Sequence, residues 1–130
     1  MATRRMFSKD IVSSDEFISL PLSAQALYFH LGMNADDDGI LSNAKSVMLV
    51  IGAKDDDIKL LLAKRFLLLF NEKYLVVKHR KINNQMRKDR YVKTKYNEIK
   101  EQLYVEKNNS YTEDKSKGIP LIGNEFQSVD

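Results

Sequence analysis

The fold is decided by residues 44–79, which read AKSVMLVIGAKDDDIKLLLAKRFLLLFNEKYLVVKH. In the first part of this stretch apolar residues recur at helical spacing, which places Val47 and Ile51 on one face of a predicted helix over residues 44–51. Gly52 can adopt the left-handed backbone conformation that is common just after the end of a helix. The sequence therefore predicts a helix that stops at Gly52.

A second helix follows almost at once. Asp55 is expected to cap it, and its apolar positions continue to about Phe66. Only Ala53 and Lys54 separate this start from Gly52, and two helices joined by so short a turn predict a helix-turn-helix. Residues 67–70 and 74–79 are then rich in apolar, aromatic and β-branched side chains around a polar turn, which predicts a β-hairpin.

Upstream of this stretch, Ser23 is expected to cap a helix that runs to about Met33. Residues 36–39, Asp-Asp-Asp-Gly, predict a turn into a short strand over residues 40–41. The order helix, short strand, helix, helix, hairpin is typical of a winged helix-turn-helix. We therefore expect a mainly α fold with a small β-hairpin, of the α+β class.

The C-terminal part predicts less regular structure. Thr94 is expected to cap a last helix with Tyr96, Ile99 and Leu103 on one face, packed on the domain or on a second copy. Residues 1–105 would then form a winged-helix DNA-binding domain that ends in this helix. Residues 106–130 are expected to be a flexible linker and tail, because residues 106–117 are too polar to bury much apolar surface.

Composition argues against several classes of protein. The chain has 130 residues and no cysteine, so it can form neither a disulfide nor a thiolate metal site, and a cytoplasmic location is the expectation. Its apolar runs are much shorter than the roughly 20 residues of a membrane span. Residues 34–39 resemble the start of a calcium loop, but the twelfth position would be Lys45 instead of a glutamate. We expect no metal, no cofactor and no enzymatic activity.

Positive charge is concentrated in one segment. The whole chain carries a net charge of +3, whereas residues 78–95 hold eight basic residues and one acid, a local charge of +7. Such a segment can neutralise nucleic-acid phosphates, and the alternative is a solvated basic loop. The predicted DNA-binding residues are Lys78, Arg80, Lys81, Arg87, Lys88, Arg90, Lys93 and Lys95, together with Lys59 and Lys64 from the helix that begins at Asp55.

That helix is less suited to contact DNA bases as a recognition helix. Asp55, Asp56 and Asp57 lie in its first turn and repel phosphate. Its outward face is mixed and could equally contact another protein. The predicted protein-interaction residues are Leu60 on this helix and Tyr96, Ile99 and Leu103 on the last one.

Three motifs resemble a known family. They are Arg4-Arg5-Met6-Phe7-Ser8-Lys9, Pro21-Leu22-Ser23-x-Gln25-Ala26-Leu27-Tyr28-Phe29-His30-Leu31, and Ala35-Asp36-Asp37-Asp38-Gly39. Together with Lys81-Ile82-Asn83-Asn84 and Arg87-Lys88-Asp89-Arg90-Tyr91, they are similar to the N-terminal domain of phage replisome organisers, over about residues 4–103. Arg80 stands where that family usually has an aromatic residue.

The resemblance implies a winged-helix protein of replication initiation, from a phage or prophage of Gram-positive bacteria and related in architecture to DnaD-like primosome proteins. It implies DNA and a second copy of the chain as partners, and a host helicase or helicase loader as a further one. This chain ends soon after the expected linker, so the region that contacts the helicase is expected to be missing or reduced. Two alternatives stay open: a transcription regulator with the same fold, and a primosome scaffold that does not bind DNA.

Overall fold

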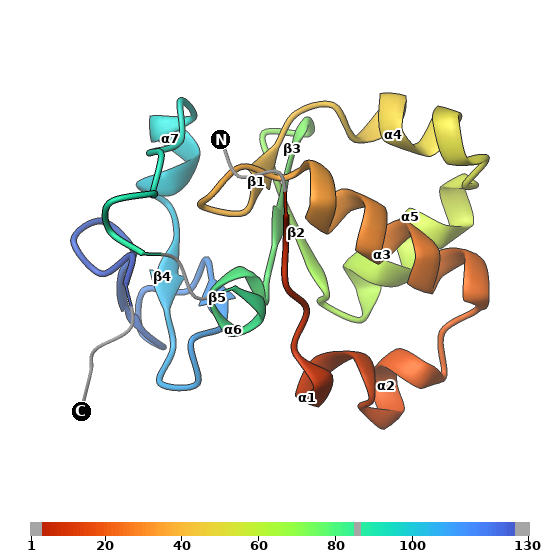
Figure 1. The fold of residues 1–130 in the computed structure, drawn as a ribbon, viewed down its shortest axis with the longest axis horizontal. Coiled ribbons are helices and arrows are strands. Elements are labelled where there is room, and N and C mark those ends of the chain that lie inside the picture. Colours follow the sequence, from red (N-terminus) through yellow and green to blue (C-terminus); the bar gives the residue numbers. More distant parts are fainter. Residues whose placement is uncertain (1–3, 85–86, 127–130) are drawn as a thin grey trace.

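A three-stranded antiparallel sheet lies in the middle of the molecule, with helices on one face and the C-terminal segment on the other (Figure 1). The computed structural model describes residues 4–84 and 87–126. A second small antiparallel sheet belongs to the C-terminal segment. The α+β class expected from the sequence is confirmed.

The helices of the N-terminal half follow the apolar periodicity of the sequence. They are α1 (Lys9–Val12), α2 (Asp15–Ile18), α3 (Leu22–Asn34), α4 (Ala44–Ile51) and α5 (Asp55–Ala63). The predicted bounds of α4 are confirmed, and Gly52 follows it in the left-handed conformation with φ of 75°.

The ends of α5 differ from the prediction. Lys54, not Asp55, is the cap residue, and its backbone N–H donates to the Asp57 carboxylate at 3.0 Å. The helix ends at Ala63, before Phe66, because Arg65 adopts a φ of 65° that no helix continues. The chain then turns directly into the sheet.

The central sheet joins a single short strand to a hairpin. Its strands are β1 (Ile40–Leu41), β2 (Leu67–Phe70) and β3 (Tyr74–Val77), in the order β1-β3-β2. The predicted hairpin is confirmed, and Asn71 and Glu72 at its tip both have positive φ.

Both faces of this sheet are buried, in two separate hydrophobic clusters. Leu41 and Leu75 pack with the helices in the first cluster, around Phe17, Tyr28 and Leu61. The alternate strand residues, among them Ile40, Leu68 and Val76, pack in the second cluster with Ile99, Leu103, Tyr111 and Leu121. A sheet that is buried on both faces accounts for the nearly continuous apolar runs of β2 and β3.

The second cluster is completed by a segment that composition alone predicts to be a linker. After α6 (Arg80–Asn83) and α7 (Asn97–Lys100), the chain forms β4 (Tyr104–Val105), β5 (Tyr111–Thr112) and β6 (Ile119–Pro120), in the order β5-β4-β6. Tyr111 and Leu121 are fully buried. Few apolar residues suffice here because the central sheet supplies the rest of the core. Residues 127–130 of the expected tail lie outside the described part of the chain.

The last helix is shorter than predicted. The sequence predicts a helix capped by Thr94 that reaches Leu103, whereas α7 covers only Asn97–Lys100. Leu103 turns into the second cluster, and its carbonyl accepts a hydrogen bond from the Leu121 N–H at 3.0 Å. Leu103 is therefore part of a sheet-like contact instead of a helical face.

A short chain of polar side chains crosses the first cluster. The Asn83 amide donates to the Tyr28 hydroxyl at 2.9 Å, and that hydroxyl lies 3.3 Å from Nδ1 of His79. The Tyr28 hydroxyl can donate its proton to His79 or accept from it, depending on the imidazole tautomer. Burial lowers the pKa of His79 to about 4, so the imidazole is neutral near pH 7 and can accept this bond.

Candidate functional site

The three aspartates between α3 and β1 are structural anchors, although their sequence reads as an exposed turn. We call residues 36–39 the aspartate loop. Asp37 and Asp38 are each only 2% exposed. The Asp36 carboxylate accepts the backbone N–H groups of Asp38 and Ile40, each at 3.0 Å, which closes the turn.

The aspartate loop holds the last part of the predicted basic run. The backbone N–H of Val92 donates to Asp37 at 2.9 Å, and that of Thr94 donates to Asp38 at 3.0 Å. The Thr94 hydroxyl donates to Asp36. Each aspartate thus accepts a hydrogen bond from a different donor within residues 92–94. These bonds fix this stretch against the edge of the domain.

Two buried cations balance the charge of the loop. Arg5 pairs with Asp37 at 2.9 Å, and the Lys100 ammonium lies 3.5 Å from Asp38 and 2.7 Å from Glu125. These pairs offset part of the local negative charge, which weakens the repulsion of an approaching anion by the aspartate loop.

The Tyr91 hydroxyl bridges one of these pairs. It donates to Asp38 at 2.6 Å and accepts from Lys100 at 2.7 Å. Burial, together with the hydrogen bond to Asp38, raises the pKa of Tyr91 well above its ordinary value. The hydroxyl therefore keeps its proton and links residue 91 to the same anchor.

Five of the predicted DNA-binding residues stand exposed on the segment that this anchor fixes. We call them the basic strip: Arg87, Lys88, Arg90, Lys93 and Lys95. Arg87 pairs with Asp89 at 3.1 Å at the surface, and the Lys95 ammonium lies 5.3 Å from the centroid of the Tyr96 ring. Residues 85 and 86, inside the predicted basic run, lie outside the described residues.

The other predicted DNA-binding residues are elsewhere. Arg80 and Lys81 are only 6% and 5% exposed, so neither offers a surface to a phosphate. The Arg80 side chain packs beneath the aspartate loop, and burial lowers its pKa. Lys78 is half-buried, while Lys59 on α5 and Lys64 just after it are exposed. The strip and α5 therefore present separate groups of cations.

The predicted protein-interaction residues lie mostly inside the chain. Ile99 and Leu103 are each 1% exposed and belong to the second cluster. Leu60 is half-buried against the first cluster. Tyr96 is half-buried, with its hydroxyl 2.7 Å from that of Ser42. The structure thus removes Ile99 and Leu103 from any surface that a partner could meet.

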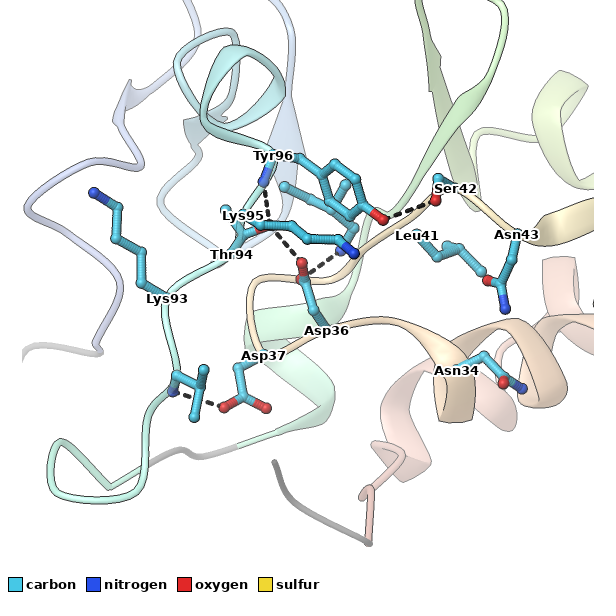
Figure 2. Close-up of a pocket in the computed structure, with 12 residues that line it drawn as sticks. Asn34, Asp36, Asp37, Leu41, Ser42, Asn43, Lys93, Thr94, Lys95 and Tyr96 are labelled. Carbon is cyan, nitrogen blue, oxygen red and sulfur yellow. Dashed lines mark hydrogen bonds between the residues drawn. The ribbon is translucent and has the colours of Figure 1, made fainter.

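A groove runs beside the basic strip, between residues 92–96 and the start of α4 (Figure 2). Its volume is about 510 Å³, and its walls include Leu41, Val92 and Tyr96. Lys95 extends across the groove toward Ser42, whereas Lys93 points away from it (Figure 2). Sequence reasoning missed this groove, because its two walls are about 50 residues apart and are brought together by long-range contacts, the bonds to the aspartate loop and the bond between the Tyr96 and Ser42 hydroxyls.

Other kinds of site are not found in the described part of the chain. Over residues 4–84 and 87–126, no three His, Asp or Glu side chains gather in a way that could hold a metal ion. None of the helices within those ranges has the length and apolar character needed to cross a membrane. Comparison of the chain with protein-family models, curated proteins and solved structures finds no match.

Proposed function

We propose that this protein binds DNA through the basic strip. The observation that carries the proposal is that five exposed cations stand on a segment anchored to the domain by the aspartate loop. Fixed cations neutralise phosphates with less loss of side-chain and backbone freedom than cations on a mobile loop. The anchoring favours this proposal over a merely solvated basic loop.

The proposed architecture is a winged helix-turn-helix. Its support is the order α3, β1, α4, α5 and the hairpin β2-β3, with β1 paired to β3. In this proposal α5 is the recognition helix and residues 71–73 form the tip of the wing. The exposed Asp55 and Asp56 at the start of α5 repel phosphates, so the basic strip supplies most of the affinity.

The proposed cellular role is replication initiation in a phage or prophage, with DNA bound at an origin and helicase or primosome proteins recruited to it. Its support is the resemblance of residues 4–103 to phage replisome organisers. Several residues of the motifs that carry the resemblance also form the anchor. They include Arg5, Asp37 and Tyr91. The resemblance thus coincides with the feature that positions the basic strip.

The test is duplex DNA binding over a salt series. The triple variant Arg90→Ala, Lys93→Ala, Lys95→Ala removes three strip cations, and Lys107→Ala, Lys115→Ala, Lys117→Ala removes three exposed lysines from the C-terminal segment. We expect the first variant to lower the slope of log affinity against log salt by up to about 3, and the second to keep the native slope. Equal effects of the two variants, or a native chain without salt-dependent binding, would refute the proposal.

A protein scaffold is the second candidate function, and one observation favours it. Leu49 and Val50 on α4 are 83% and 84% exposed, which is unusual for two adjacent large apolar residues. If the chain acts as a scaffold, Leu49→Glu with Val50→Glu should reduce self-association in sedimentation experiments and leave duplex DNA binding unchanged.

A further inference from the structure

The groove beside the basic strip has the size and lining of a ligand site. Its volume of about 510 Å³ falls within the range of small-molecule pockets. Val92 and Tyr96 form one wall, and Leu41 contributes to the other. Two exposed amides, those of Asn34 and Asn43, lie at the end of the groove near α3 and α4 (Figure 2), and the Asn34 amide donates one bond to the His30 carbonyl at 2.8 Å.

The charged groups of the groove suit an anionic ligand. Lys95 crosses it, with its ammonium over the Tyr96 ring. Asp36 and Asp37 also line the groove, but their carboxylates bond Thr94, Ile40, Val92 and Arg5 within the chain. Arg5 balances the charge of Asp37, whereas Asp36 keeps its negative charge with its oxygens already accepting bonds, so Lys95 is the side chain placed to meet a ligand's negative charge.

We propose that this groove takes one unpaired nucleotide of a single DNA strand that lies along the basic strip. The inference rests on the proposed function and deepens it. The base stacks on the Tyr96 ring, Lys95 moves from that ring to the adjoining phosphate, and Asn34 and Asn43 offer amide groups to the edge of the base. A duplex cannot enter in this way, because its bases are paired and stacked away from a concave wall.

Two charge-matched substitutions on α4 test the proposal. Asn43 lines the groove and makes no capping bond through its side chain, whereas Ser46, one turn later, is also exposed but does not line it. Binding of fluorescein-labelled oligothymidylate and of a labelled hairpin duplex is measured by anisotropy for the native chain, Asn43→Glu and Ser46→Glu. Both variants lower the net charge by the same amount.

We expect Asn43→Glu to weaken binding of oligothymidylate about tenfold, and Ser46→Glu to leave it within about twofold of the native value. Duplex binding should be the same for the two variants. Equal binding of oligothymidylate by both variants would overturn the groove proposal while DNA binding by the strip stands. A native chain that binds neither probe would overturn the proposed function itself, and tighter binding of oligouridylate would overturn the assignment to DNA.

Discussion

Arg5 and Asp37 form an ion pair of 2.9 Å across 32 positions of the sequence, and their side chains are only 3% and 1% exposed. Asp37→Ala leaves the Arg5 guanidinium buried without its carboxylate and removes the acceptor of the Val92 N–H. We expect the free energy of unfolding to fall by about 3 kcal/mol, measured by chemical denaturation.

The control for this substitution is a surface ion pair of the same length. Arg65 and Glu113 also approach to 2.9 Å, but their side chains are 52% and 45% exposed. Glu113→Ala should lower the free energy of unfolding by at most about 1 kcal/mol. A loss in Asp37→Ala as small as in Glu113→Ala would show that the aspartate loop is not an anchor.

Gly39 is required by both conformation and space. Its φ is +87°, and an added Cβ would lie 2.7 Å from the Cβ of Arg80. Gly52 has a similar φ of +75° but nothing within 4 Å of such a Cβ. We expect Gly52→Ala to cost about 1 kcal/mol and Gly39→Ala about 3 kcal/mol, because only the latter adds a clash to the backbone strain. Thermal unfolding of the two variants measures the difference, and equal losses would contradict the packing of Arg80 under the loop.

The Tyr91 hydroxyl is a link in the anchor and not a surface group. Tyr91→Phe removes its bonds to Asp38 and Lys100, and we expect a loss of about 2 kcal/mol in the free energy of unfolding. Tyr104, also half-buried, is the matched control, because its hydroxyl makes no hydrogen bond within residues 4–84 and 87–126. Tyr104→Phe should change stability by less than about 0.5 kcal/mol. If both changes cost the same, the bridge between Asp38 and Lys100 contributes nothing.

His79 should make stability depend on pH. Its pKa is about 4 in the folded chain, against an ordinary value of 6.5. Above pH 6.5 the imidazole is neutral in both states and contributes no pH dependence. Between pH 6.5 and 4 mainly the unfolded chain binds the proton, so the free energy of unfolding falls as pH falls, by about 3 kcal/mol over the whole range.

Denaturation at a series of pH values tests this prediction with two substitutions. His79→Gln removes the titrating group and keeps an acceptor for Tyr28, so the decline between pH 6.5 and 4 should flatten. His30 is exposed, and His30→Gln should keep the native decline. A native slope in His79→Gln would assign the decline to other groups.

Local patterns predicted the parts of the fold that depend on neighbours in sequence. The helix of residues 44–51 and the hairpin on either side of residues 71–73 follow from apolar spacing and from a polar turn. The second sheet could not be predicted in this way, because β4, β5 and β6 are two residues long and carry no period. Its stability comes from distant partners such as Ile40 and Val76.

The candidate site, too, could be predicted from the sequence only in part. The density of basic residues predicted Lys93 and Lys95 as DNA contacts, and both are exposed. It predicted Arg80 and Lys81 in the same way, although both are buried. Composition does not distinguish a cation at the surface from one under the aspartate loop. The sequence predicts only a turn at the aspartates, since buried acids such as Asp37 and Asp38 become stable only when distant cations and N–H groups reach them.

The burial of the central sheet on both faces has a consequence for how the chain melts. Ile40 and Leu41 are neighbours in β1, yet each contributes to a different hydrophobic cluster. Neither cluster can lose its packing without exposing the strands that form one wall of the other. The helical part and the C-terminal sheet therefore unfold as one cooperative unit, with a single calorimetric transition whose calorimetric and van't Hoff enthalpies agree.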